Sequence, residues 1–143
     1  MKVYSLIMIV YFLNPILSNG QKSGTIHMTV DGIKDENGTL RIGLFSEQDE
    51  FLEEPSYSRD IKIDQQSEIQ TSFENIPHGV YAISVYHDLN DDNILDSNFI
   101  GMPKEPVGFS NEHQPKMGPP KFNGAKFILD QEEIILTVSM YSY

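Results

Sequence analysis

Apolar and polar residues alternate along much of the chain after residue 23. Residues 24–33, GTIHMTVDGI, place Ile26, Met28 and Val30 on one side, and residues 39–47, TLRIGLFSE, repeat the alternation. A period of two is typical of a strand with one buried face. Between the two segments, DENG at 35–38 contains Asn-Gly, which readily adopts the positive-φ geometry of tight turns. These two segments are therefore predicted to form a β-hairpin.

Further segments with strand character follow. They are residues 61–64, 67–76, 79–87, 125–129 and 132–141. The segment GVYAISVYH (79–87) is apolar on both faces for much of its length, which is typical of a central strand covered on both sides. No window has a convincing helical period. The sequence therefore predicts an all-β fold, an immunoglobulin-like antiparallel β-sandwich of about seven strands.

Residues 97–124 form an unusually long connection between predicted strands. They contain five of the eight prolines of the chain and show little periodicity. They also contain apolar residues spread through the segment, in which a disordered segment would be poorer. Connections of this length in compact domains are commonly functional. We expect one long ordered loop folded over an end or a face of the sandwich.

The first twenty residues differ from the rest of the chain. Lys2 precedes the uncharged apolar run VYSLIMIVYFL, and Ser18-Asn19-Gly20 follows it. This order is typical of a secretory signal peptide, and the apolar run is too short to span a bilayer comfortably. The sequence predicts a signal peptide over 1–20, cleaved near Gly20, and a single mature domain over 21–143. That domain would be secreted or periplasmic and would have no transmembrane segment.

The charge of the chain limits its partners. With 21 Asp and Glu against 10 Lys and Arg, the formal net charge is -11. Nucleic acids and anionic lipids require basic surfaces, so neither is an expected partner. The chain has no cysteine, so a disulfide cannot stabilise the exported domain. Stability must come from the core or from bound ions.

An acidic stretch, HDLNDDNILDSN at 87–98, follows the predicted central strand. Asp88, Asn90, Asp92 and Asp96 stand at relative positions 1, 3, 5 and 9, and Ile94 at position 7 can offer its backbone carbonyl. This is the oxygen spacing of a calcium loop, because calcium takes six to eight oxygen ligands. The pattern predicts a calcium-type loop between β elements.

Two positions depart from that calcium pattern. Asn93 replaces the usual glycine at position 6, and Phe99 replaces the glutamate at position 12. Asn enters the left-handed region more easily than most residues, and Glu105 is the nearest carboxylate that could close the site. The alternative is a polar turn whose Asp and Asn side chains accept hydrogen bonds from their own backbone.

The same region carries a family resemblance. The segment FENIPHGVYAISVYHDLNDDNILDSNFIGMPKEPVGFSN (73–111) and the later GPPKFNGAKF (118–127) resemble the bacterial family called domain of unknown function 2141. The resemblance covers about residues 24–141 and is strongest from Phe73 to Phe127. At the centre of the motif Asp92-Asn93 replaces a frequent Asn-Gly. The resemblance implies an exported, sandwich-like protein and brings no established activity.

Catalytic and ligand-binding alternatives rest on fewer residues. His87, Asp88 and Glu105 could form an acid–base set for hydrolysis, but His87 is better explained as a strand-end histidine bonded to a loop backbone. Aromatic residues could form a sugar- or peptide-binding surface, although most aromatics in sandwiches belong to the core. They are Tyr57, Tyr86, Phe99, Phe109, Tyr141 and Tyr143.

Together these observations predict an exported, non-enzymatic module that binds or scaffolds an unknown protein or ligand at the cell envelope. A calcium loop formed by Asp88, Asn90, Asp92, Ile94 and Asp96, closed by Glu105, would order the long 97–124 segment. Two alternatives stay open. One is a calcium-independent adhesion or transport accessory module, and the other is a hydrolase using His87, Asp88 and Glu105.

Overall fold

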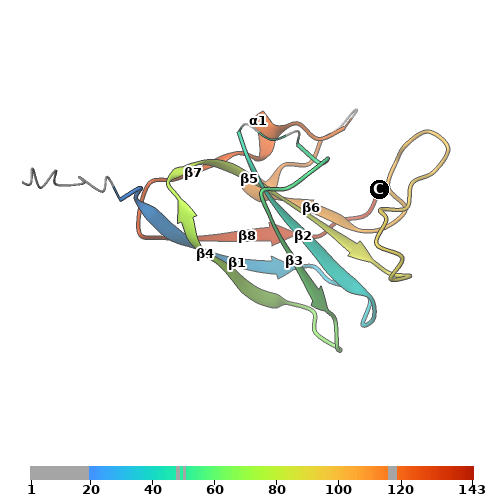
Figure 1. Ribbon diagram of the computed structural model, residues 1–143. Coiled ribbons are helices and arrows are strands. Elements are labelled where there is room, and N and C mark those ends of the chain that lie inside the picture. The colour runs from blue at the N-terminus through green and yellow to red at the C-terminus, as the bar shows by residue number, and fades with distance from the viewer. Residues whose placement is uncertain (1–19, 48, 50, 116–118) are drawn as a thin grey trace, which may run out of the picture.

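Two β-sheets packed face to face form the computed structural model of the protein, which describes residues 20–47, 49, 51–115 and 119–143 (Figure 1). The smaller sheet has three strands in the order β4-β1-β8. Its strands are β1 (Ser23–Asp31), β4 (Ile69–Pro77) and β8 (Glu133–Ser139). The chain is therefore an all-β sandwich, as the period-two patterns predicted.

The larger sheet has five strands in the order β3-β2-β5-β6, and β7 pairs with the first residues of β5. Its strands are β2 (Thr39–Ser46), β3 (Tyr57–Lys62), β5 (Gly79–Asp88), β6 (Val107–Phe109) and β7 (Phe127–Leu129). A short 3-10 helix, η1 (Ser110–Glu112), and one helical turn, α1 (Phe122–Ala125), complete the elements. The segment predicted as a central strand is β5, which has β2 on one side and β6 and β7 on the other.

The main core lies between the two sheets. Alternate residues of each strand point into it, and the largest fully buried side chains include Ile26, Leu40, Ile83 and Leu129. Full burial of one such side chain contributes about 1.5–3 kcal/mol relative to its exposure. The spacing of apolar residues thus explains which face of each strand is buried.

The predicted hairpin between the first two strands is wrong. The first strand, β1, pairs with β4 and β8, whereas β2 pairs with β3 and β5 in the other sheet. The turn itself is present, because Gly38 has a φ of 95°. This turn carries the chain from one sheet to the other. The Asn37-Gly38 pair therefore predicted the turn correctly but did not predict which strands pair.

Two further details of the prediction need correction. The sheets are mostly antiparallel, but β1 and β8 run parallel. The segment 97–124 is not strandless, because β6 lies within it and pairs with β5 from Ser84 to Tyr86. Three residues are too few for a period to be recognised, and Pro106 immediately precedes the strand.

The described part of residues 97–124 folds over the outer face of the five-stranded sheet. A second apolar cluster forms there from Ala82, Val107, Phe109 and Ala125, with Phe51 and Phe122 packed against it. This location agrees with the expected ordered excursion over a face of the sandwich. It also explains why β5 is apolar on both faces.

None of the helices in the described part of the chain is long and apolar enough to cross a membrane. The predicted signal peptide, residues 1–20, lies outside the described residues except for Gly20.

Candidate functional site

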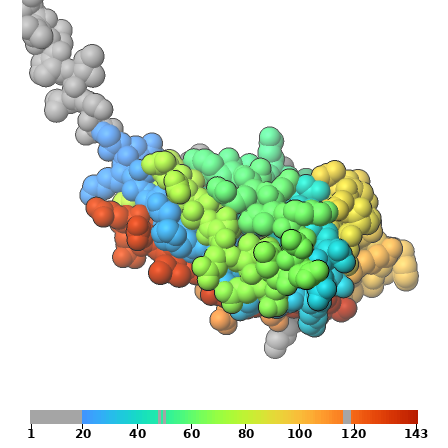
Figure 2. All heavy atoms as spheres, turned by 90° about the horizontal axis from the view of Figure 1, so that it is seen from below, coloured from blue at the N-terminus to red at the C-terminus, as the bar shows by residue number. Residues whose placement is uncertain are grey.

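The acidic loop begins at the end of β5 and lies at the end of the molecule opposite the first residues of β1 (Figure 2). Asp88, the last residue of β5, is fully buried, with 0% of its surface exposed. Residues 89–94 are all exposed. The loop therefore has a buried anchor and an exposed turn.

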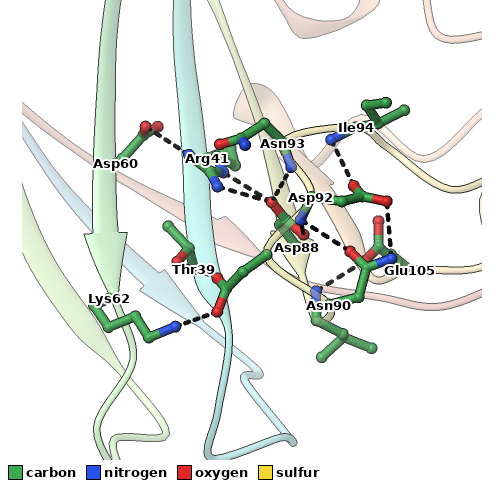
Figure 3. Close-up of polar contacts among 12 residues, drawn as sticks. Thr39, Arg41, Asp60, Lys62, Asp88, Asn90, Asp92, Asn93, Ile94 and Glu105 are labelled. Atoms are coloured by element: carbon green, nitrogen blue, oxygen red, sulfur yellow. Dashed lines mark hydrogen bonds and ion pairs between the residues drawn. The ribbon is translucent and has the colours of Figure 1, made fainter.

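Asp88 accepts hydrogen bonds from two sides. Its Oδ2 accepts from Arg41 Nε at 3.0 Å and from Asn93 N at 2.9 Å, and its Oδ1 accepts from Asp92 N at 3.2 Å (Figure 3). Burial by itself raises the pKa of Asp88, but the Asn93 amide, Arg41 and the Asp92 amide outweigh burial and lower that pKa. The carboxylate is therefore held in its charged form.

Arg41 on β2 joins this loop to the edge strand β3. Its Nη2 lies 2.9 Å from Oδ2 of Asp88, and its Nη1 donates to Asp60 Oδ2 at 2.7 Å. The Arg41 side chain is only 16% exposed, whereas that of Asp60 is 57% exposed. One guanidinium therefore offsets two carboxylates, one buried and one at the surface.

Glu105 fixes the loop from the opposite side. Its Oε1 accepts from Leu89 N at 2.8 Å, and its Oε2 accepts from Asp96 N at 3.0 Å. The side chain is 4% exposed. Because the two amides lie at opposite ends of the loop, one carboxylate holds the loop closed.

Three predicted ligands gather on the exposed side of the loop. The Nδ2 of Asn90 donates to Asp92 Oδ2 at 2.9 Å and to Asp96 Oδ2 at 3.4 Å. The Oδ1 of Asp92 accepts from Ile94 N at 2.9 Å. At position 6, Asn93 has a φ of 67°, the left-handed geometry expected of the residue that replaces glycine. Three of the six predicted ligands, Asn90, Asp92 and Asp96, therefore lie within hydrogen-bond distance of one another, through the amide nitrogen of Asn90.

Calcium binding by this loop remains a prediction. Asp88 and Glu105 use both carboxylate oxygens to accept N–H groups, which is the arrangement of the self-bonded turn. Within residues 20–47, 49, 51–115 and 119–143, no group of three or more His, Cys, Asp or Glu side chains is placed to hold a metal ion.

The sequence patterns missed one loop residue, Asp91. Its Oδ1 accepts from Thr39 Oγ1 at 2.6 Å, and its Oδ2 forms an ion pair with Lys62 on β3. The hydrogen bonds from Lys62 and Thr39 lower the pKa of Asp91. Asp91 falls between the alternate positions of the calcium pattern, so the sequence did not single it out. The structure shows its contacts with β2 and β3, which its left-handed φ of 57° accompanies.

His87 is 1% exposed and its Nε2–H donates to the carbonyl of Asn37 at 2.6 Å. This is the strand-end role expected for it. Gly38 lies directly against it, since a Cβ at Gly38 would lie 3.0 Å from His87 Nε2 and 2.5 Å from the Asp88 carbonyl oxygen. His87 therefore fixes the Asn37-Gly38 turn, which connects the two sheets, to the end of β5.

A groove of about 1280 Å³ lies on the outer face of the five-stranded sheet, beside the acidic loop. Its floor contains Ser58, Gly43 and Ser84, which the strand register places side by side on β3, β2 and β5. Because these side chains are small, they leave open space above the sheet, and this space is the groove. Phe109 on β6 pairs with Ser84 and continues this row.

The walls of the groove come from loops. Leu52 and Pro55 lie in the connection between β2 and β3, residues 93–95 and 97 belong to the acidic loop, and residues 100–103 follow it. Of the aromatic residues considered from sequence, Tyr86, Phe109 and Tyr143 line the groove. Phe99 lies outside it, is 98% exposed, and is thus not part of a common aromatic surface. The groove was not apparent from sequence because its floor comes from three strands.

One family model matches the chain, over residues 28–136, and its description is "Uncharacterized protein conserved in bacteria (DUF2141)". No curated protein and no solved structure matches the chain significantly.

Proposed function

The chain belongs to the bacterial family DUF2141, and we propose that it is an exported, non-enzymatic binding module of the cell envelope. Its ligand occupies the groove on the outer face of the five-stranded sheet. The acidic loop fixes one wall of that groove, and calcium strengthens the loop.

The groove is the observation that carries this proposal. Its volume of about 1280 Å³ exceeds the 300–1,000 Å³ of typical small-molecule pockets, so it has room for a ligand larger than a typical small molecule. Most of the residues named in its floor and walls are apolar or small, and its side is open to solvent. Such a concave apolar surface with a few polar groups is the usual form of a binding site.

The acidic loop supports the groove by fixing its backbone. Residues 93–95 and 97 belong to the wall, and the neighbouring amides of Asn93 and Asp96 donate to the buried carboxylates of Asp88 and Glu105. An amide bonded to a charged group contributes about 1.5–3 kcal/mol. A wall held this way is preorganised, which lowers the entropic cost of binding.

Calcium is proposed to fix the backbone of the acidic loop further. The oxygens of Asp88, Asn90, Asp92 and Asp96 and the Ile94 carbonyl would share the ion, and Glu105 would hold the loop around it. At about 1 mM calcium and a dissociation constant near 0.1 mM, typical of extracellular sites, the gain is about 1.4 kcal/mol. That gain orders a loop without creating the fold.

A calcium-independent module is the second candidate, and one observation favours it. The N–H groups that fix the loop already meet both oxygens of Asp88 and Glu105, so protein groups alone can order the wall. Its groove would bind the same ligand with and without calcium.

The hydrolase alternative has little support. His87, Asp88 and Glu105 are each less than 5% exposed, and none of them lines the groove. A general acid or base must come within hydrogen-bond reach of its substrate. These three side chains instead bond to the backbone of neighbouring loops or to Arg41.

A neutral apolar dye, Nile red, tests whether the groove binds ligands. We expect its fluorescence to rise with the mature domain and this rise to be lost in Ser84→Tyr, which fills the floor. Ser72→Tyr makes the same change on β4, on the outer face of the other sheet, and should leave the signal intact. Equal signals from both variants would refute the groove as the binding site.

A further inference from the structure

The charged residues that line the groove carry a small excess of acid. Among its described lining residues, the charged ones are Arg41, Glu53 and Asp60. Arg41 is already paired with both Asp60 and Asp88, so its charge is more than offset. The groove therefore presents a net negative charge to a ligand.

The acidic loop carries further carboxylates beside the groove, although they do not line it. Asp92 and Asp96 lie on its exposed side, joined through Asn90, and Figure 3 shows Asp60 and Asp92 on opposite sides of Arg41. The whole chain carries a formal charge of -11. Clefts lined by one sign of charge attract ligands of the opposite sign.

Most of the groove lining is apolar. Phe45, Leu52, Pro55 and Phe109 line it, and Pro119 and Pro120 lie along the same groove. The floor also carries the hydroxyl groups of Ser58 and Ser84. Hydroxyls both donate and accept hydrogen bonds, so they suit the amide groups of a polypeptide backbone.

We propose that the groove binds an extended peptide segment that carries apolar side chains and at least one lysine or arginine. This inference rests on the proposed function, because it names the ligand of the same groove. The apolar side chains lie against Leu52 and Met102, which line the groove and are exposed, and the cationic side chain lies beside Asp60. The Ser58 and Ser84 hydroxyls bond to the peptide backbone.

Charge complementarity selects this ligand over other occupants. A second copy of the chain would bring another net charge of -11 to an acidic groove. Anionic lipids are repelled for the same reason. A carbohydrate would find no tryptophan to stack on, since the chain has none. A basic and apolar peptide complements both the excess of acid and the apolar lining of the groove.

Fluorescence anisotropy with short labelled peptides tests the inference. The probes alternate leucine with lysine, with glutamine or with glutamate, and a fourth alternates serine with lysine. We expect the leucine–lysine peptide to bind about tenfold more tightly than the leucine–glutamate peptide at low salt, with the leucine–glutamine peptide between them. The serine–lysine peptide should bind at least about tenfold more weakly, because it lacks apolar side chains.

Two substitutions locate the peptide in the groove. Asp60→Asn should weaken the leucine–lysine peptide about threefold and leave the leucine–glutamine peptide unchanged. Glu74→Gln removes an exposed carboxylate from β4 in the other sheet and serves as its control. Ser84→Tyr should weaken the peptide more than about tenfold, while Ser72→Tyr should not. Met102→Ser, in the wall, replaces Ser84→Tyr if that variant does not fold.

The outcomes separate this inference from the proposed function. Equal affinity for the lysine, glutamine and glutamate peptides, all lost in Ser84→Tyr, would overturn the charge selection and leave the groove as a binding site. Binding that survives Ser84→Tyr and Met102→Ser would show nonspecific attraction and overturn the inference. If no peptide binds while Nile red does, the ligand is not a peptide and the proposed function still stands.

Discussion

Arg41 and Asp88 form an ion pair between the neighbouring strands β2 and β5, with Nη2 of Arg41 2.9 Å from Oδ2 of a fully buried carboxylate. The same carboxylate accepts the amides of Asp92 and Asn93. One buried residue thus connects the larger sheet to the acidic loop.

Asp88→Asn should lower the free energy of unfolding by about 3 kcal/mol, because it leaves a poorly exposed guanidinium without its buried partner. Urea unfolding of the mature domain measures the change. Asp60→Asn removes the exposed partner of the same arginine and should cost no more than about 1 kcal/mol. Equal costs for the two substitutions would contradict the buried role of Asp88.

The lowered pKa of Asp88 also predicts a pH dependence. A carboxylate whose folded pKa lies below its ordinary value of 3.8 stabilises the fold fully above that value. Its contribution is lost as the pH falls through the folded pKa. Urea unfolding between about pH 5 and pH 2 should show this loss, and the pH slope should be shallower in Asp88→Asn. An unchanged slope would show that other groups govern acid unfolding.

Glu105→Gln should loosen the wall of the groove, because a glutamine amide cannot accept both loop amides as the carboxylate does. The expected cost is about 1–3 kcal/mol for a buried donor left without its acceptor. Hydrogen exchange at the amides of Leu89 and Asp96 should become faster. The exposed Glu112→Gln is the control, and slow exchange retained in Glu105→Gln would refute the anchoring role.

The period-two pattern predicted much of the fold from local sequence. It located β5 as a central strand and placed Ile26 and Met28 on one face, which is buried in the core, because burial follows alternation within one strand. It could not assign partners. The Asn37-Gly38 turn has the expected geometry but joins two different sheets, and only the pairing of β1 with β4 and β8 excludes a hairpin.

In the candidate site, too, contacts between residues close in sequence were predictable, whereas contacts between distant residues were not. Spacing along the chain predicted that Asn90, Asp92 and Asp96 would meet, because alternate residues of a tight turn point to one side. The sequence did not predict that Arg41 and Asp91 belong to the site, because their contacts, Arg41 with Asp88 and Asp91 with Thr39, join residues about 50 positions apart. The groove floor depends on strand register, which no local pattern contains.

Calcium should raise the melting temperature of the mature domain by about 5 °C at about 1 mM, the equivalent of about 1.4 kcal/mol. Asp92→Asn and Asp96→Asn should abolish the increase, whereas Asp64→Asn, in the exposed connection after β3, should retain it. Thermal melts with calcium and with chelator give the comparison. Identical melting temperatures would refute the calcium proposal and favour the calcium-independent module.

Affinity capture from an envelope extract tests the central claim, that the groove is the binding surface, most directly. Immobilised wild-type domain and the Ser72→Tyr variant should retain the same component. The Ser84→Tyr variant, folded as judged by its melting curve, should lose it. Retention of that component by Ser84→Tyr at the wild-type level would contradict the claim and place the binding surface elsewhere on the molecule.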